Sequence, residues 1–139
     1  MIPSLPRGFA CLVLGLGLAA LAPSARADDL GENAKARAAA AGEAYRLASR
    51  RLVEIGDPAS SATLELLHLW SRRLMEAQQE VSNKKEDKIA AAQAHLVRMK
   101  ELEDVVKKQV DVGFRAPDSG ATKFYRLEAE RQVLLAKAK

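Results

Sequence analysis

The chain has 139 residues and a formal net charge of +4 at pH 7. This charge does not indicate a nucleic-acid-binding surface, because Arg7 and Arg26 precede all 18 acidic residues and the chain after them is close to neutral. The length and the scarcity of aromatic residues fit one modest domain whose core is built from alanine, leucine and valine.

Residues 1–27 have the pattern of a cleavable export signal. Arg7 supplies a positive start, residues 9–22 form an uncharged apolar run, and Pro23 ends it. Ala25-Arg26-Ala27 then places small residues where a signal peptidase requires them. An uncleaved anchor is the alternative, but the run is shorter than the roughly 20 residues that cross a bilayer.

Cleavage after Ala27 would leave a domain at residues 28–139 and predicts a periplasmic or secreted location. Cys11 is the only cysteine and lies early in the apolar run, whereas a lipid-modified cysteine would lie at its end. A lipoprotein is therefore the weaker alternative. The exported chain would carry no disulfide and no thiolate site.

The first helix is predicted from about Glu32 to Ile55. A heptad-like seam runs along it, made of Ala34, Ala38, Ala41, Tyr45, Ala48, Leu52 and Ile55. Gly56-Asp57-Pro58 ends the helix, because glycine suits the position past a helix end and proline cannot continue it. Small seam residues bury little area, so we expect a monomer of marginal stability and a partner helix on this seam.

The second helix is predicted from Ser61 to Val81, with Ser60-Ser61 as its capping region. Its apolar stripe consists of Leu67, Trp70, Leu74, Ala77 and Val81. The polar residues 82–88 predict a turn, in which Asn83 and Glu86 have the spacing of a capping box. One continuous helix through this stretch is the alternative.

The third helix is predicted from about Lys85 to Val112, and Gly113 opens the loop after it. Its stripe consists of Ile89, Ala92, Leu96, Met99, Leu102, Val106 and Val110. The fourth helix is predicted from about Ala121 to Ala138, with Phe124, Leu127 and Leu134 on its apolar face.

The two helix pairs resemble each other. Arg73-Leu74-Met75-Glu76-Ala77-Gln78 aligns with Tyr125-Arg126-Leu127-Glu128-Ala129-Glu130, and each stretch follows a loop that opens with glycine and contains proline. We therefore predict an all-α fold of two helix–loop–helix hairpins, forming an elongated antiparallel coiled coil or small bundle after a cleaved signal peptide.

The second pair is similar to the helical hairpins of TolC-like outer-membrane efflux proteins and to short exported bacterial coiled-coil proteins. The matching residues are Val112-Gly113, residues 125–130 and Leu134-Leu135, and the resemblance covers most of residues 44–139. It implies a periplasmic hairpin that packs against other hairpins. A channel function is not implied, since no segment has the alternation of a membrane-spanning strand and residues 119–122 replace the usual apolar pair.

Few residues point to chemistry. Glu65 and His68 form a Glu-x-x-His unit of the kind used in di-iron bundles, but His95 has Ala92 where a second unit needs glutamate. Phosphate-loop, HExxH and nucleophile-elbow motifs are not found. We therefore expect no enzyme activity, no catalytic or cofactor-binding residues, no metal site and no cofactor.

The remaining candidates are weaker. The pairs Arg50-Arg51 and Arg72-Arg73 suit anionic headgroups or peptidoglycan, although a solvated helix face is the simpler interpretation. Trp70 lies on an apolar stripe, which predicts a core position rather than a stacking site for a ligand.

We expect a non-enzymatic structural or interaction protein of the cell envelope. Its partner is expected to be a protein, either a second copy or an envelope helical protein, with no nucleic acid or small-molecule substrate and with membrane contact only through the signal peptide. The alternative is a small periplasmic chaperone-like protein. The Leu-Thr-x-x-Gln signature of one such class does not occur, and Ala62-Thr63-Leu64-Glu65 is the nearest stretch.

Overall fold

The computed structural model describes residues 24–53, 60–114 and 119–138. They form four helices, α1 (Ser24–Val53), α2 (Ser61–Val81), α3 (Lys85–Asp111) and α4 (Ser119–Ala138), with no strand among the described residues. The predicted all-α class is therefore confirmed over this part of the chain. Residues 1–23 of the predicted signal peptide lie outside the described residues, whereas its cleavage site falls within α1, which begins at Ser24 rather than near Glu32.

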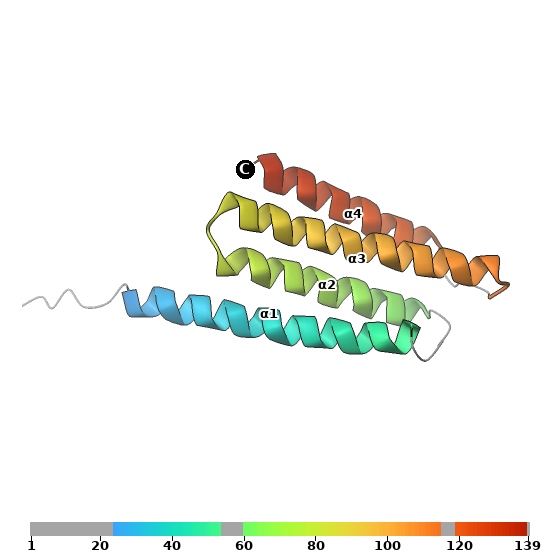
Figure 1. Ribbon diagram of the computed structural model, residues 1–139, viewed down its shortest axis with the longest axis horizontal. Coiled ribbons are helices and arrows are strands. Elements are labelled where there is room, and N and C mark those ends of the chain that lie inside the picture. Colours follow the sequence, from blue (N-terminus) through green and yellow to red (C-terminus); the bar gives the residue numbers. More distant parts are fainter. Residues whose placement is uncertain (1–23, 54–59, 115–118, 139) are drawn as a thin grey trace, which may run out of the picture.

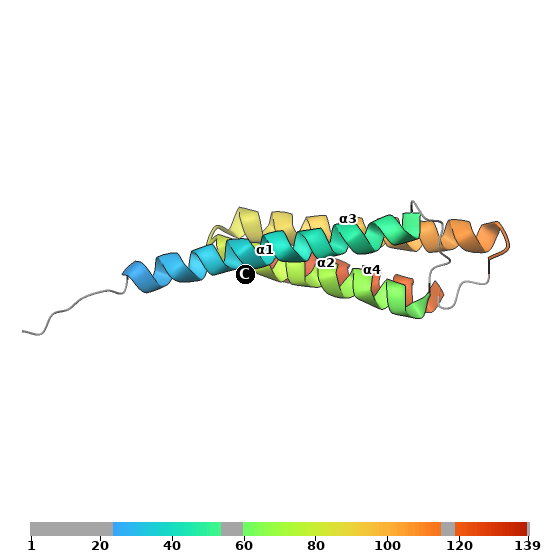
Figure 2. The same cartoon turned by 90° about the horizontal axis from the view of Figure 1, so that it is seen from below.

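Successive helices run in opposite directions and pack side by side in chain order, α1 on α2, α2 on α3 and α3 on α4 (Figure 1). Seen from below, α2 and α4 lie on the same side of the bundle (Figure 2). The larger buried cluster draws on all four helices and contains Leu52, Leu64, Leu67, Met99, Leu102, Val106 and Ala129. A second cluster contains Met75, Ala91, Ala92 and Val133.

The alanine seam of α1 is covered by α2 of the same chain. Ala41 is 4% exposed and lies beside Trp70 and Arg73. At the neighbouring Gly42, an added Cβ would lie 3.8 Å from Leu74 Cδ1, so the two helices pack closely there. The burial of this part of the seam is therefore accounted for by α2 of the same chain, and the expected partner helix stays a prediction.

The sequence predicts α2 well. Its bounds are those expected, and the Ser60 side chain caps it by accepting a hydrogen bond from the Thr63 backbone N–H at 3.1 Å. The preceding stretch at Gly56-Asp57-Pro58 and the seam residue Ile55 lie outside the described residues.

Residues 82–84 separate α2 from α3, so the predicted turn is confirmed and the continuous helix is not. The predicted capping box is wrong, because α3 takes Lys84 rather than Asn83 as its N-cap, without a side-chain bond. Ser82 orders the turn instead. Its Oγ accepts from the Lys84 backbone N–H at 3.2 Å and donates to Asp87 Oδ2 at 2.5 Å.

Gly113 ends α3 with a φ of 92°, as its glycine predicts. The Phe114 backbone N–H donates to the Gln109 carbonyl at 2.9 Å, and the Gly113 N–H donates to the Val110 carbonyl at 2.9 Å. These two bonds make a Schellman motif, which satisfies carbonyl groups that the helix end would otherwise leave unpaired.

The predicted apolar face of α4 is wrong. Phe124, Leu127 and Leu134 are 61%, 47% and 67% exposed. The buried face of α4 instead carries the small residues Thr122, Ala129 and Val133. Small side chains allow α4 to pack closely against its neighbours. The stabilisation from this close packing exceeds what burial of the leucines on the other side of α4 would give.

No helix in the described part of the chain is both long enough and apolar enough to span a membrane.

Candidate functional site

The structure brings the two histidines together in the interior of the bundle. The ring centroids of His68 on α2 and His95 on α3 are 6.0 Å apart. His95 is 1% exposed. Each histidine has a different set of polar neighbours, and together these neighbours form the main polar cluster in the core.

A hydrogen-bond chain connects Arg98, Ser71 and His95. Arg98 Nε donates to Ser71 Oγ at 2.7 Å, and Ser71 Oγ lies 2.7 Å from His95 Nδ1. A hydroxyl oxygen can accept two hydrogen bonds and donate one, so the direction of the Ser71–His95 bond depends on which ring nitrogen of His95 carries the proton.

The electrostatics agree with a neutral His95. Burial, together with the positive charge of Arg98, lowers the pKa of His95 from 6.5 to about 4. The Ser71–His95 contact looks like that of a nucleophile and its base. However, Ser71 is 0% exposed, so no substrate reaches this hydroxyl in the folded bundle.

His68 packs between α2 and α4. Its ring stacks on Tyr125 with centroids 4.1 Å apart and planes 4° apart. Its Nε2 lies 3.4 Å from Glu128 Oε2, within ion-pair range but without hydrogen-bond geometry. Burial lowers the pKa of His68, and the nearby Glu128 carboxylate opposes that shift.

The structure places Glu65 and His68, the Glu-x-x-His unit noted in the sequence, at the surface of α2 that faces α4. Both residues line a shallow groove between α2 and α4, together with Ala62, Leu66, Leu69 and Tyr125. Among the described residues no three histidine, cysteine, aspartate or glutamate side chains are placed to hold a metal ion. The chemistry that the histidine cluster supports is therefore hydrogen bonding and stacking within the bundle.

No pattern in the sequence assigns Ser71, Arg98 or Tyr125 to the polar cluster around the two histidines. A signal for the cluster exists in α3, because Ala92, His95, Met99, Leu102 and Val106 repeat at intervals of three and four. That repeat places His95 in the core and Leu96 at its edge. The sequence carries no comparable signal that His95 on α3 faces Ser71 on α2.

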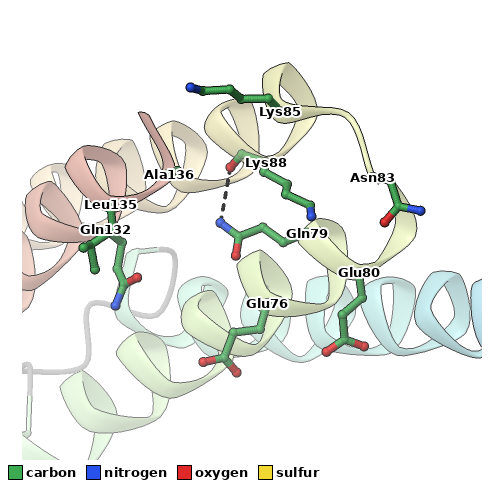
Figure 3. Close-up of a pocket in the computed structure, with 9 residues that line it drawn as sticks. All are labelled: Glu76, Gln79, Glu80, Asn83, Lys85, Lys88, Gln132, Leu135 and Ala136. Carbon is green, nitrogen blue, oxygen red and sulfur yellow. Dashed lines mark hydrogen bonds between the residues drawn. The ribbon is translucent and has the colours of Figure 1, made fainter. Parts of the chain in front are cut away.

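A polar cleft lies near the turn between α2 and α3, with α4 on its other side (Figure 3). Gln79 Nε2 donates to the Lys88 carbonyl across it at 3.2 Å. Its two carboxylates are already in ion pairs, Glu76 with Arg72 at 2.9 Å and Glu80 with Arg37 at 2.6 Å. The cleft therefore gathers no uncompensated acidic charge for a ligand.

The basic pairs singled out in the sequence lie on helix surfaces. Arg50 and Arg51 are exposed on α1. Arg73 lies over the ring of Trp70, 4.8 Å from its centroid, in a cation–π contact. Trp70 is thus half-buried at the edge between α1 and α2 rather than in the core.

The solvent side of α4 carries several large apolar side chains that no other helix of the bundle covers. We use the name outer α4 face for the side that carries Phe124, Leu127, Arg131 and Leu134. Its three apolar members are 47% to 67% exposed. Exposed apolar residues scattered singly are normal, whereas several on one helix face indicate a contact surface.

No protein-family model, curated protein or solved structure matches this chain.

Proposed function

We propose that the chain is an exported, non-enzymatic interaction protein that acts through its outer α4 face. The exposed row of Phe124, Leu127 and Leu134 carries this proposal. A helix that exposes its large apolar side chains to solvent lacks the stabilisation that their burial would give, which is about 1.5–3 kcal/mol for each fully buried side chain. That loss is offset when another surface covers the face.

The proposal includes the finer architecture suggested by the sequence. In it, α1 with α2 and α3 with α4 are two related helical hairpins, similar to those of TolC-like proteins, and they act in the periplasm or outside the cell after removal of residues 1–27. Sequencing the N-terminus of the exported protein tests this part. We expect it to begin at Asp28, and retention of Met1 would contradict export by cleavage.

A photo-crosslinking residue at position 127 tests the contact surface in cells that export the chain. The matched control is the same residue at Val97, which is 53% exposed on α3. We expect adducts, identified by mass spectrometry, from position 127 and not from position 97. Equal yields at the two positions would show that the outer α4 face has no special role.

A chaperone-like role is the second candidate. It is favoured by the groove between α2 and α4, where Leu66 is 48% exposed and Leu69 is 39% exposed near Tyr125. A client-aggregation assay separates the two candidates. Suppression of aggregation that is lost in Leu66→Gln and retained in Leu127→Gln would favour client binding in the groove.

A further inference from the structure

The two acidic residues of α4 both contact side chains of the bundle, although Glu130 lies in the same helical row as Lys123 and Lys137, seven residues from each. Glu130 accepts a hydrogen bond from Arg126 Nη1 at 2.7 Å, and Arg126 Nε also donates to Glu103 on α3 at 2.6 Å. Glu128 lies against His68 in the groove between α2 and α4. Both acidic residues of α4 are therefore engaged within the bundle.

The exposed basic residues of α4 are not balanced in this way. Lys123, Arg131 and Lys137 are exposed. No ion pair joins any of them to an acidic residue in the part of the chain that the structure describes. The outer α4 face and its flank thus combine exposed leucine and phenylalanine side chains with uncompensated positive charge.

The position of Arg131 narrows the choice of partner. It follows Leu127 by four residues and precedes Leu134 by three, so all three share one side of the helix. In a seam between two helices its guanidinium would be buried and would need an acidic partner. At a lipid surface its aliphatic stem lies among the leucines while the guanidinium reaches the phosphate layer.

From these observations we infer that the outer α4 face binds the surface of an anionic membrane, with α4 lying in the plane of the headgroups. The side chains that enter the boundary between headgroups and acyl chains are those of Phe124, Leu127 and Leu134. Lys123, Arg131 and Lys137 contact lipid phosphates. A basic helix with a row of leucine and phenylalanine has the features of an interfacial membrane helix. This inference rests on the proposed use of the outer α4 face and names its partner.

Vesicle co-sedimentation tests the inference. The protein is purified after export by cells, and N-terminal sequencing checks that all variants begin at the same residue. The probes are vesicles of phosphatidylcholine with one quarter phosphatidylglycerol, and vesicles of phosphatidylcholine alone. We expect binding to the anionic vesicles at low salt, and weaker binding to the neutral vesicles and at high salt. The triple variant Lys123→Gln, Arg131→Gln, Lys137→Gln should bind the anionic vesicles about tenfold more weakly than the unaltered protein, or weaker still.

A matched variant on α3 controls for the general loss of positive surface charge. It combines Lys100→Gln, Lys107→Gln and Lys108→Gln, all at exposed positions. We expect it to bind vesicles as the unaltered protein does. The fluorescence emission of the tryptophan in Leu134→Trp should shift to the blue with anionic vesicles and not with neutral ones. The tryptophan in Val97→Trp should show no shift with either kind of vesicle.

The outcomes separate this inference from the proposed function. Equal vesicle binding by both triple variants, or no vesicle binding at all, would overturn the membrane inference. If position 127 then still crosslinks to a protein or to a second copy, the outer α4 face remains a contact surface with a different partner. If it crosslinks to nothing, the proposed function fails as well.

Discussion

Ser71 Oγ lies 2.7 Å from His95 Nδ1, and the same oxygen accepts a hydrogen bond from Arg98 Nε at 2.7 Å. This contact joins α2 to α3 in the middle of the bundle. It also holds His95 in its neutral form beside a permanent positive charge. Several measurable properties of the bundle follow from this contact.

The first prediction concerns pH. The pKa of His95 is about 4 in the folded chain and near 6.5 when unfolded, so the unfolded state binds more protons between these values. Its contribution to stability is complete above about pH 6.5 and declines as the pH falls towards 4. The full loss is about 3 kcal/mol, measured as the free energy of unfolding in urea at several pH values.

His95→Asn provides the control for that prediction. Its Oδ1 can still accept from Ser71, while the side chain no longer titrates. The variant should be less stable at neutral pH but should lose less stability than the unaltered protein between pH 6.5 and 4. Parallel pH profiles for the two proteins would show that His95 is not the group responsible.

The second prediction concerns Ser71→Ala. This change leaves Arg98 Nε without its acceptor and His95 Nδ1 without its hydrogen-bond partner, both in partly or fully buried positions. We expect a loss of about 1–3 kcal/mol in the free energy of unfolding. Ser61→Ala, at an exposed position of the same helix, should change it by less than about 0.5 kcal/mol. Similar effects of the two changes would contradict the hydrogen-bond chain.

The helices could be predicted from sequence because local signals define them. Ser60 as a cap and Gly113 as a stop act through the backbone of their own neighbours, so no knowledge of the tertiary structure is needed. The face of α4 could not be predicted in this way. Both Leu127 and Ala129 are compatible with a helix core, and the contact with α3 decides between them.

In the candidate site too, contacts within one helix could be predicted from the sequence, whereas contacts between helices could not. His68 and Glu65 could be recognised as a pair because they are three residues apart on one helix. The contacts that define the site join different helices, as in the stacking of His68 on Tyr125. Such pairs depend on the relative rotation and shift of α2 and α4, which a single sequence does not specify.

The third prediction concerns the alanine seam. Ala41→Glu places a carboxylate at a position that is 4% exposed under α2, and its desolvation should cost several kcal/mol. We expect a large fall in melting temperature without a change from one association state to another. Ala40→Glu is the control, because Ala40 is the exposed neighbour in α1. An unchanged melting temperature in Ala41→Glu would place the seam on the surface.

The fourth prediction tests which side of α4 faces the core. Ala129 is 0% exposed and packs with Leu102 and Met99 in the larger buried cluster, so the added methyl groups of Ala129→Leu have no space. Overpacking of this kind costs about 1–3 kcal/mol. Leu127→Ala removes a side chain that is 47% exposed and leaves no closed cavity, so its cost should be below about 1 kcal/mol. Thermal unfolding followed by circular dichroism measures both. If Leu127→Ala were the more destabilising of the two, Leu127 would belong to the core, and the outer α4 face would not be available for binding.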